Sequence, residues 1–198
     1  MIAAMKAYIR WTDTFNHITG RIMMYGIFVM MGILLWSSIS KTFFVPTLWT
    51  LEMAQFAMVA YYMLGGPYAM QMGSNVRMDL FYGDWSLRRK AWVDAFTIFF
   101  LIFYLVILLW GGISSTAYSL GHFQGEPFTF FANIVGAFFT GGPTAVGEVT
   151  GHMETGTSAW RPYIWPIKLI MCMGIFLMLL QAFSEFFKDV LRIREEPF

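Results

Sequence analysis

The chain has almost no cysteine, because Cys172 is the only one among its 198 residues. One thiol cannot form an internal disulfide, hold an iron–sulfur cluster or build a cysteine zinc site. Histidine is also scarce, and His17, His122 and His152 all lie outside the apolar runs described below. A haem-binding bundle takes its axial ligands from inside the bundle, and no His, Asp and Glu cluster suited to a catalytic metal is visible. We therefore expect no cofactor, no metal and no catalytic residue, so the chain should not be an enzyme.

Charged residues are also scarce, because only 13% of the residues are charged while 58% are hydrophobic. Soluble domains are about one quarter charged and about half apolar or less. A chain of this size has no room to hide so much apolar surface in a core of its own, so lipid must cover part of it. The net charge of +1 gives no indication of nucleic-acid binding. The composition therefore predicts an all-α integral membrane protein.

Four apolar runs have about the 20 residues that a helix needs to cross the hydrocarbon core. We predict an arm at 1–20, spans at about 21–41, 50–73, 92–118 and 163–187, and an outer connection at 119–162. The short connection Lys41–Trp49 predicts an antiparallel hairpin of the first two spans. The first apolar run exceeds a signal-peptide core of roughly 7–15 residues and no small-residue cleavage site follows it, so we interpret it as a retained anchor. No repeat or soluble domain is visible, and residues 1–198 read as a single membrane domain.

The basic residues predict the orientation, because cytoplasmic segments are enriched in Lys and Arg. They concentrate in the arm, in the connection between the second and third spans, and in the C-terminal tail: Lys6, Arg10, Arg21, Arg77, Arg88, Arg89, Lys90, Lys188, Arg192 and Arg194. The opposite side carries only Lys41, Arg161 and Lys168. We therefore expect both termini in the cytoplasm.

Two segments outside the spans are amphipathic or apolar. In the arm, one helical face would carry Tyr8, Trp11, Phe15, Ile18 and Ile22. That pattern favours a helix lying flat in the cytoplasmic interface, although a continuous extension of the first span remains possible. The outer connection contains the apolar stretch FTFFANIVGAFFTGGP at 128–143, too short and too rich in glycine to span. It predicts a short helix that contacts either lipid or a partner protein.

Polar residues inside spans are costly and therefore suggest function, but here they all lie near span edges. Glu52 opens the second span, Asp94 the third, and Lys168 lies about one and a half turns into the fourth. Glu185 lies near the inner end, where it can reach headgroups or Lys188. Glu52 and Lys168 lie at a similar outer level, so they either form a pair or are solvated separately. This distribution does not favour a proton relay or an ion site.

Small residues in the second span predict close helix packing. Gly65, Ala69 and Gly73 form a stripe at intervals of four, and Gly65 to Pro67 suggests a kink. A broken helix at a transport site would need a second, matching repeat, which the sequence lacks. A subunit of a larger membrane assembly fits these features best. A stand-alone four-helix transporter and the membrane anchor of a redox or lipid enzyme remain as alternatives.

Three stretches resemble the small membrane subunit of tripartite ATP-independent periplasmic (TRAP) transporters, the DctQ-like family. The first is WTLEMAQFAMVAYYMLGGPYAMQMGSNVRMDL (49–80), which opens near Glu52 and closes on Arg77 and Asp79. Asn75 stands where family members often have histidine. The second is SLRRKAWVDAF (86–96), a basic turn before the third span. The third is SAWRPYIWPIKLIMCMGIFLMLLQAF (158–183), with Trp160, Pro162, Trp165, Pro166, Lys168 and Gln181.

The resemblance implies a non-catalytic subunit that braces a large membrane transport subunit in the inner membrane of a bacterium or archaeon. A periplasmic solute-binding protein would deliver the substrate, often a small organic acid. Sodium would drive import as a symport, with the sodium sites in the large subunit. We expect Arg77 and Asp79 either to cap the second span or to be two solvated charges. Trp160 and Trp165 would anchor the outer end of the fourth span, where Pro162 and Pro166 suit a helix start.

Overall fold

The computed structural model describes residues 2–73 and 85–194. These residues form six helices: α1 (Ile2–Met24), α2 (Gly26–Phe43), α3 (Thr50–Gln71), α5 (Leu87–Ser119), α6 (Pro127–Val149) and α7 (Trp165–Ile193). No strand occurs in these two ranges, apart from one isolated bridge between Thr155 and Tyr163. The all-helical fold expected from composition is confirmed for the described chain. Its physical basis is that a helix satisfies all its backbone groups internally, as lipid requires.

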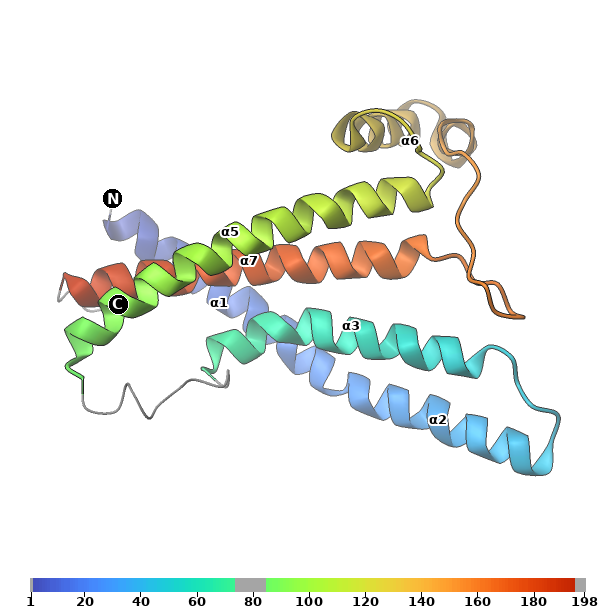
Figure 1. Cartoon of the computed structure of the whole chain (residues 1–198), viewed down its shortest axis with the longest axis horizontal. Helices are drawn as coiled ribbons and strands as arrows, with labels where there is room; N and C mark the ends of the chain where they lie inside the picture. Colours follow the sequence, from blue (N-terminus) through green and yellow to red (C-terminus); the bar gives the residue numbers. More distant parts are fainter. Residues whose placement is uncertain (1, 74–84, 195–198) are drawn as a thin grey trace.

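The helices form a layered bundle in which α5 and α7 run side by side (Figure 1). α3 packs on α7, α2 packs on α3, and α1 crosses both α3 and α7. The bundle has a terminal end, where α1 and α5 start and α7 finishes. It also has a loop end, which carries the α2–α3 turn, α6 and the start of α7. The predicted hairpin of the first two spans is present as the antiparallel pair α2 and α3.

Three segments are long and apolar enough to cross a membrane within the described residues. They are Ile2–Phe43, which joins α1 and α2 across a turn at Tyr25, Arg89–Ser119 in α5, and Trp165–Ile193 in α7. α3 is not among them, because Glu52, the glutamines and the Gly65–Pro67 segment lower its hydropathy. Crossing by α3 therefore remains a prediction.

Helix boundaries differ from the predicted spans mainly at charged ends. α1 continues to Met24 rather than stopping at 20, and α7 continues beyond 187 to Ile193. Lys188 and Asp189 lie within this extension, where they form ion pairs with Asp13 and Arg192. The apolar patch of the outer connection lies in α6, whose helix is broken at Gly142, where φ is +68°, just before Pro143. α6 is seen nearly end-on in Figure 1, so it runs across the axes of α5 and α7.

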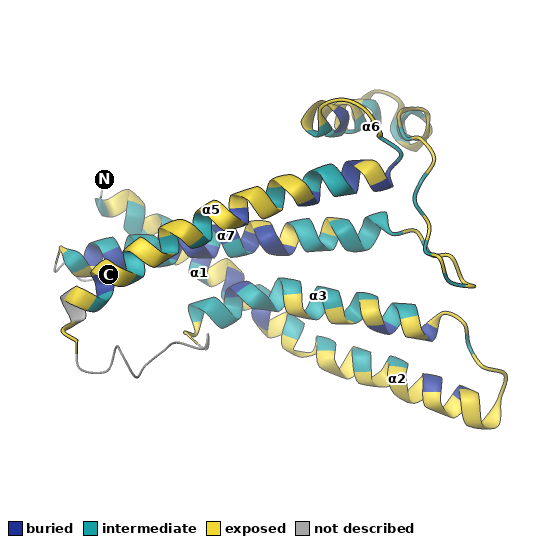
Figure 2. Cartoon of the chain, viewed as in Figure 1, coloured by how far each residue is buried: buried dark blue, intermediate teal, exposed yellow. Residues whose placement is uncertain are grey.

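Burial concentrates where α1, α3, α5 and α7 cross (Figure 2). The main core cluster contains Leu105 of α5 and Ile175, Leu179 and Ala182 of α7. A second cluster, formed by Ala117, Leu120 and Phe130, joins α5 to α6. Outside these contacts most large apolar side chains are exposed, as in Phe139, which is 82% exposed. Such a surface is expected where lipid or another membrane subunit covers the helices.

Candidate functional site

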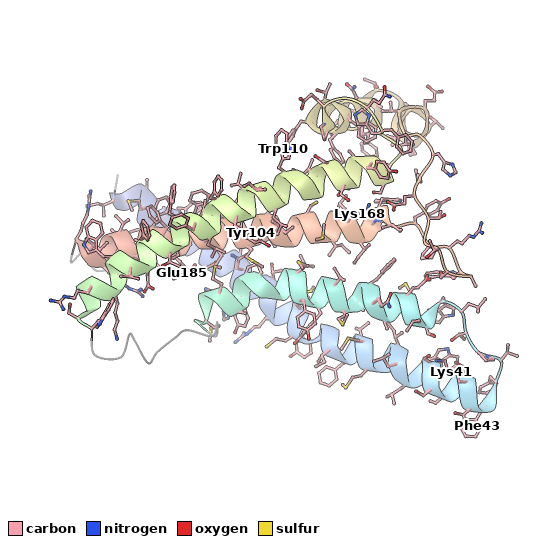
Figure 3. The ribbon with its side chains drawn as sticks, viewed as in Figure 1. Lys41, Phe43, Tyr104, Trp110, Lys168 and Glu185 are labelled. Atoms are coloured by element: carbon pink, nitrogen blue, oxygen red, sulfur yellow. The ribbon has the colours of Figure 1, made fainter. Side chains whose placement is uncertain are left out.

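The densest polar group in the described chain lies where α1 crosses α7. We call it the α1–α7 polar cluster, and it consists of Asp13, Asn16, Gln181, Ser184, Glu185 and Lys188. Gln181 and Ser184 are fully buried, and Asn16 is 1% exposed. α1 presents Asp13 and Asn16 three residues apart, and α7 presents the other four within two turns. Figure 3 labels Glu185 at this terminal end and Lys168 near the loop end.

One ammonium group lies between two carboxylates in the cluster, whose formal charge is therefore −1. Lys188 Nζ lies 2.7 Å from Asp13 Oδ2 and 2.7 Å from Glu185 Oε1. Ser184 Oγ donates to Asp13 Oδ1 at 3.0 Å. The cluster therefore holds two carboxylates on one lysine, with neutral donors supplying the remaining hydrogen bonds.

Gln181 is the bridge of the cluster. Its Nε2 donates to Asp13 Oδ1 at 3.0 Å and to Glu185 Oε1 at 3.0 Å. Its Oε1 accepts a hydrogen bond of 2.7 Å from Asn16 Nδ2. Further bonds tie α1 into the bundle, because Gln71 Nε2 of α3 donates to the Asp13 carbonyl at 3.1 Å. The arrangement joins three helices, although Asn16 Oδ1 is buried without a hydrogen-bond partner.

α1 presents its polar face to the bundle and its apolar face outward. Ile9, Thr12, Asn16 and Gly20 are buried against the bundle. Trp11, Phe15, Ile18 and Ile22 are exposed, as expected for a lipid-facing stripe. Tyr8 is the exception, because its hydroxyl donates to the Leu180 carbonyl at 3.1 Å and its ring packs edge-on against Phe187. The predicted apolar face is therefore present except for Tyr8.

At the loop end, Lys168 has a different partner from the one considered in the sequence. Its Nζ lies 2.7 Å from Glu154 Oε2 and donates to the Ser115 carbonyl at 3.3 Å. This pair joins the outer connection to α7 and α5. Glu52 has one carboxylate oxygen buried without a hydrogen-bond partner. The Glu52–Lys168 pair is thus not formed, because Glu154 in the outer connection reaches Lys168.

Close helix packing uses other glycines than the predicted stripe. A Cβ at Gly174 would lie 2.6 Å from the Met63 carbonyl oxygen, and one at Gly66 would lie 2.7 Å from Met178 Cε. A Cβ at Gly20 would collide with Tyr68. Gly65 and Gly73 face open space, and Gly73 has φ of +63° just after α3. The close contacts of α1, α3 and α7 therefore rest on Gly20, Gly66 and Gly174. Ala69 lines an open groove between α1 and α3 together with Gly65.

The start of α7 lies at the loop end of the bundle (Figure 1). α7 begins at Trp165 with Pro166 in its first turn, where a missing N–H costs little. Trp165 packs against the α5–α6 cluster, and Trp160 is 41% exposed. The Pro162 carbonyl accepts a 2.8 Å hydrogen bond from the Gly156 amide. Arg77, Asp79 and Asn75 lie outside the described residues, so the expected cap of the second span stays a prediction.

Sequence reasoning found Gln181, Glu185 and Lys188 but missed their partners Asp13, Asn16 and Ser184. A signal was present, since Asp13 and Asn16 share a helical face and Gln181, Ser184 and Lys188 share another. What the sequence did not give was that these two polar faces meet. Within the described ranges, no group of three or more His, Cys, Asp or Glu is placed to hold a metal ion.

The fold and its polar contacts define an all-helical membrane protein whose buried polar groups hold its own helices together. Residues 30–130, just over half of the chain, match the family described as tripartite ATP-independent periplasmic transporters, DctQ component. The chain belongs to this family and is a small component of a TRAP transporter. No curated protein and no solved structure matches the chain. The matched range covers most of α2, all of α3 and α5, and the start of α6, so the α1–α7 polar cluster lies outside it.

Proposed function

We propose that this chain is the non-catalytic small subunit of a sodium-driven, binding-protein-dependent symporter that imports a small organic acid. Its role is to brace the large transport subunit in the inner membrane. The match to the DctQ component over residues 30–130 carries this proposal. The internal use of the polar groups supports a bracing role, because the α1–α7 polar cluster and the Lys168–Glu154 pair fix helices to one another.

The bracing surface is proposed to include α2 and the open groove between α1 and α3. α2 contacts the rest of the chain along only one side, and Phe28, Leu35 and Phe43 are exposed. The groove is lined by small residues, by methionines and by Tyr61 and Tyr62. Small residues permit close helix approach and methionine adapts to irregular partners. These properties suit packing against the helices of the large subunit.

The outer connection is proposed to lie at the periplasmic surface, where it is available to the binding protein. α6 has no charged residue between Glu126 and Glu148. Its N-terminal part packs on α5 through Phe130, while Val135, Phe138 and Phe139 are exposed. A helix of this kind that runs across the bundle suits the outer interface of the bilayer. Docking of the binding protein would then use the polar parts of the outer connection.

Four crossings with both termini in the cytoplasm are part of the proposal. The described chain begins and ends at the same end of the bundle, and α2, α3, α5 and α7 alternate in direction (Figure 1). A phosphatase that functions only in the periplasm should be inactive when fused after Phe198, and a cytoplasmic reporter fused there should be active. The reverse pattern would place the C-terminus in the periplasm, and it would therefore rule out four crossings with both termini in the cytoplasm.

Transport by the assembled complex tests the bracing role. Trp160→Ala and Trp165→Ala should lower the amount of assembled complex, because amphipathic rings anchor a helix end at the interface. The preference among solutes should not change. The measurement is uptake of several organic acids by proteoliposomes that contain the purified complex, normalised to assembled complex. An altered preference among solutes at equal assembly would show that this chain contacts solute. Uptake that does not depend on sodium would contradict the proposal that sodium drives transport.

A further inference from the structure

Two apolar helical stripes, one on α5 and one on α7, each have an arginine at the terminal end of the bundle. On α5, Arg89, Trp92, Phe96 and Phe99 recur at spacings of three and four, so they share one face of the helix. Trp92 is 61% exposed, Phe96 is 67% exposed and Phe99 is 61% exposed. The adjacent face of α7 carries Phe186, Val190 and Ile193, followed directly by Arg194. Both stripes therefore run from apolar residues to a cation at the terminal end.

Between these stripes lies a groove of about 470 Å³. Its lining is apolar, with Trp92, Ala95 and Phe96 on α5 and Phe186 and Val190 on α7, and with Arg194 at its terminal edge. The ten residue steps from Arg89 to Phe99 correspond to roughly 15 Å of helix. A hydrocarbon core is about 30 Å thick, so the groove matches the depth of one leaflet.

We propose that this groove binds an anionic phospholipid of the inner leaflet. One acyl chain lies along the aromatic face of α5 and the apolar face of α7. The phosphate group is held by Arg194 and Arg89, whose guanidinium groups form paired hydrogen bonds with phosphate oxygens. Arg89 and Arg194 are both exposed. Charge complementarity favours this occupant over a second apolar helix, because a helix would cover the arginines without neutralising them.

The acidic groups near the groove that the structure describes interact with other residues. Asp189 is 3% exposed, and its carboxylate lies 2.9 Å from Arg192. Glu185 is held by Lys188 at 2.7 Å. Asp94 of α5 is half-buried and has interactions of its own. Glu195 and Glu196 follow Arg194 in the sequence but lie outside the described residues.

Lipid retention by the purified full-length chain tests the headgroup contact. The chain is exchanged into nanodiscs of mixed phosphatidylglycerol and phosphatidylcholine with identical acyl chains, extracted gently, and its retained lipid is measured by native mass spectrometry. Phosphatidylglycerol should be enriched over phosphatidylcholine, and Arg89→Gln/Arg194→Gln should reduce that enrichment by about thirtyfold, the effect of two cations at a membrane surface. The matched control Arg10→Gln/Arg21→Gln removes the same charge from exposed positions of α1 and should keep the enrichment.

The groove itself is tested by filling it. Ala95→Trp should lower retention of both lipids, whereas Thr97→Trp, at an exposed position outside the groove lining, should not. Brominated phosphatidylglycerol should quench the part of the fluorescence that Trp92→Phe removes. Equal retention of the two lipids by the native chain would overturn the proposal. Displacement of lipid by inorganic phosphate alone would assign the arginines to a free anion instead.

Assembly with the large subunit distinguishes a lipid in the groove from a partner helix. If Ala95→Trp leaves lipid retention unchanged but abolishes assembly, a partner helix occupies the groove and the lipid proposal is wrong. If Glu195→Gln/Glu196→Gln lowers phosphatidylglycerol enrichment, the arginines do not hold the phosphate as proposed, because removing two negative charges from the chain should only strengthen binding of an anionic lipid. The inference requires the terminal end to lie in the inner headgroup region, and the reporter fusion after Phe198 tests that orientation separately.

Discussion

Lys188→Met should destabilise the isolated subunit more than any other single charge removal. The substitution leaves the carboxylates of Asp13 and Glu185 close together and without their cation, although their side chains are only 22% and 17% exposed. Removing one partner of a buried pair costs about 3–5 kcal/mol. For a chain of this size the melting temperature should fall by roughly 6–20 °C. The measurement is thermal unfolding of the purified chain in detergent, followed by intrinsic fluorescence and by size-exclusion chromatography.

Two variants separate the buried pair from a general charge effect. Lys41→Met removes an exposed lysine at the far end of α2 (Figure 3), and surface changes of this kind stay within about 0.5 kcal/mol. Asp13→Asn/Glu185→Gln/Lys188→Met removes all three charges and should recover most of the lost stability, because no unpaired charge remains. If the triple variant is no more stable than Lys188→Met, the loss arises from packing of the lysine stem and not from the unpaired carboxylates.

The sequence predicted the helices well because lipid imposes a simple rule on them. A long uncharged run that crosses lipid forms a helix, so α2, α5 and α7 could be located from the apolar runs in the sequence. The apolar stretch at 128–143 predicted a short helix, and it lies in α6, which is longer, with 23 residues, and is broken at Gly142. Helix ends were harder to place, because a charged residue ends an apolar run without ending the helix. Lys188 and Asp189 lie after the last apolar run, and α7 continues past them to Ile193.

Side-chain pairing could not be predicted because it depends on which faces meet. The sequence placed Glu52 and Lys168 at a similar depth in the membrane. Similar depth does not determine whether the two side chains point toward each other, because that depends on how each helix is rotated about its axis. Glu154 lies in an irregular segment, and no sequence periodicity predicts the path of such a segment. In the structure Glu154, and not Glu52, forms the ion pair with Lys168. The same reasoning applies to α1. Its apolar stripe suggested a membrane surface, whereas the opposite, polar stripe determined where α1 packs.

The glycines illustrate the same limit on the scale of one residue. Gly65, Ala69 and Gly73 have the spacing of a packing motif, but the neighbouring position Gly66 faces Met178 of α7. A shift of one residue turns a helical position by about 100°, so a stripe and its neighbour face different partners. Gly65 lines the open groove between α1 and α3. A Cβ at Gly65 would meet nothing within 4 Å, so a partner helix has room to approach this position.

Gly174→Ala should have the second large effect, at the crossing of α3 and α7. The added Cβ would meet the Met63 carbonyl oxygen at 2.6 Å and the Met63 Cβ at 2.7 Å. Backbone atoms cannot move aside as a flexible side chain can, so the two helices must separate by most of an ångström. Overpacking of this kind costs about 1–3 kcal/mol, and the higher helix propensity of alanine offsets at most about 1 kcal/mol of that. Thermal unfolding of the purified chain should show a lower melting temperature.

A graded series of the same substitution tests whether the contact geometry sets the cost. Gly66→Ala meets only the flexible end of Met178 and should cost less than Gly174→Ala, and Gly65→Ala meets nothing within 4 Å. Gly65→Ala should therefore leave the isolated chain as stable or slightly more stable, through helix propensity alone. Equal losses at all three positions would contradict the packing assignment. The same three variants then probe the complex, because Gly65→Ala should reduce co-purification with the large subunit only if the α1–α3 groove receives one of its helices. Full assembly of Gly65→Ala would move the bracing surface away from this groove and onto the exposed face of α2.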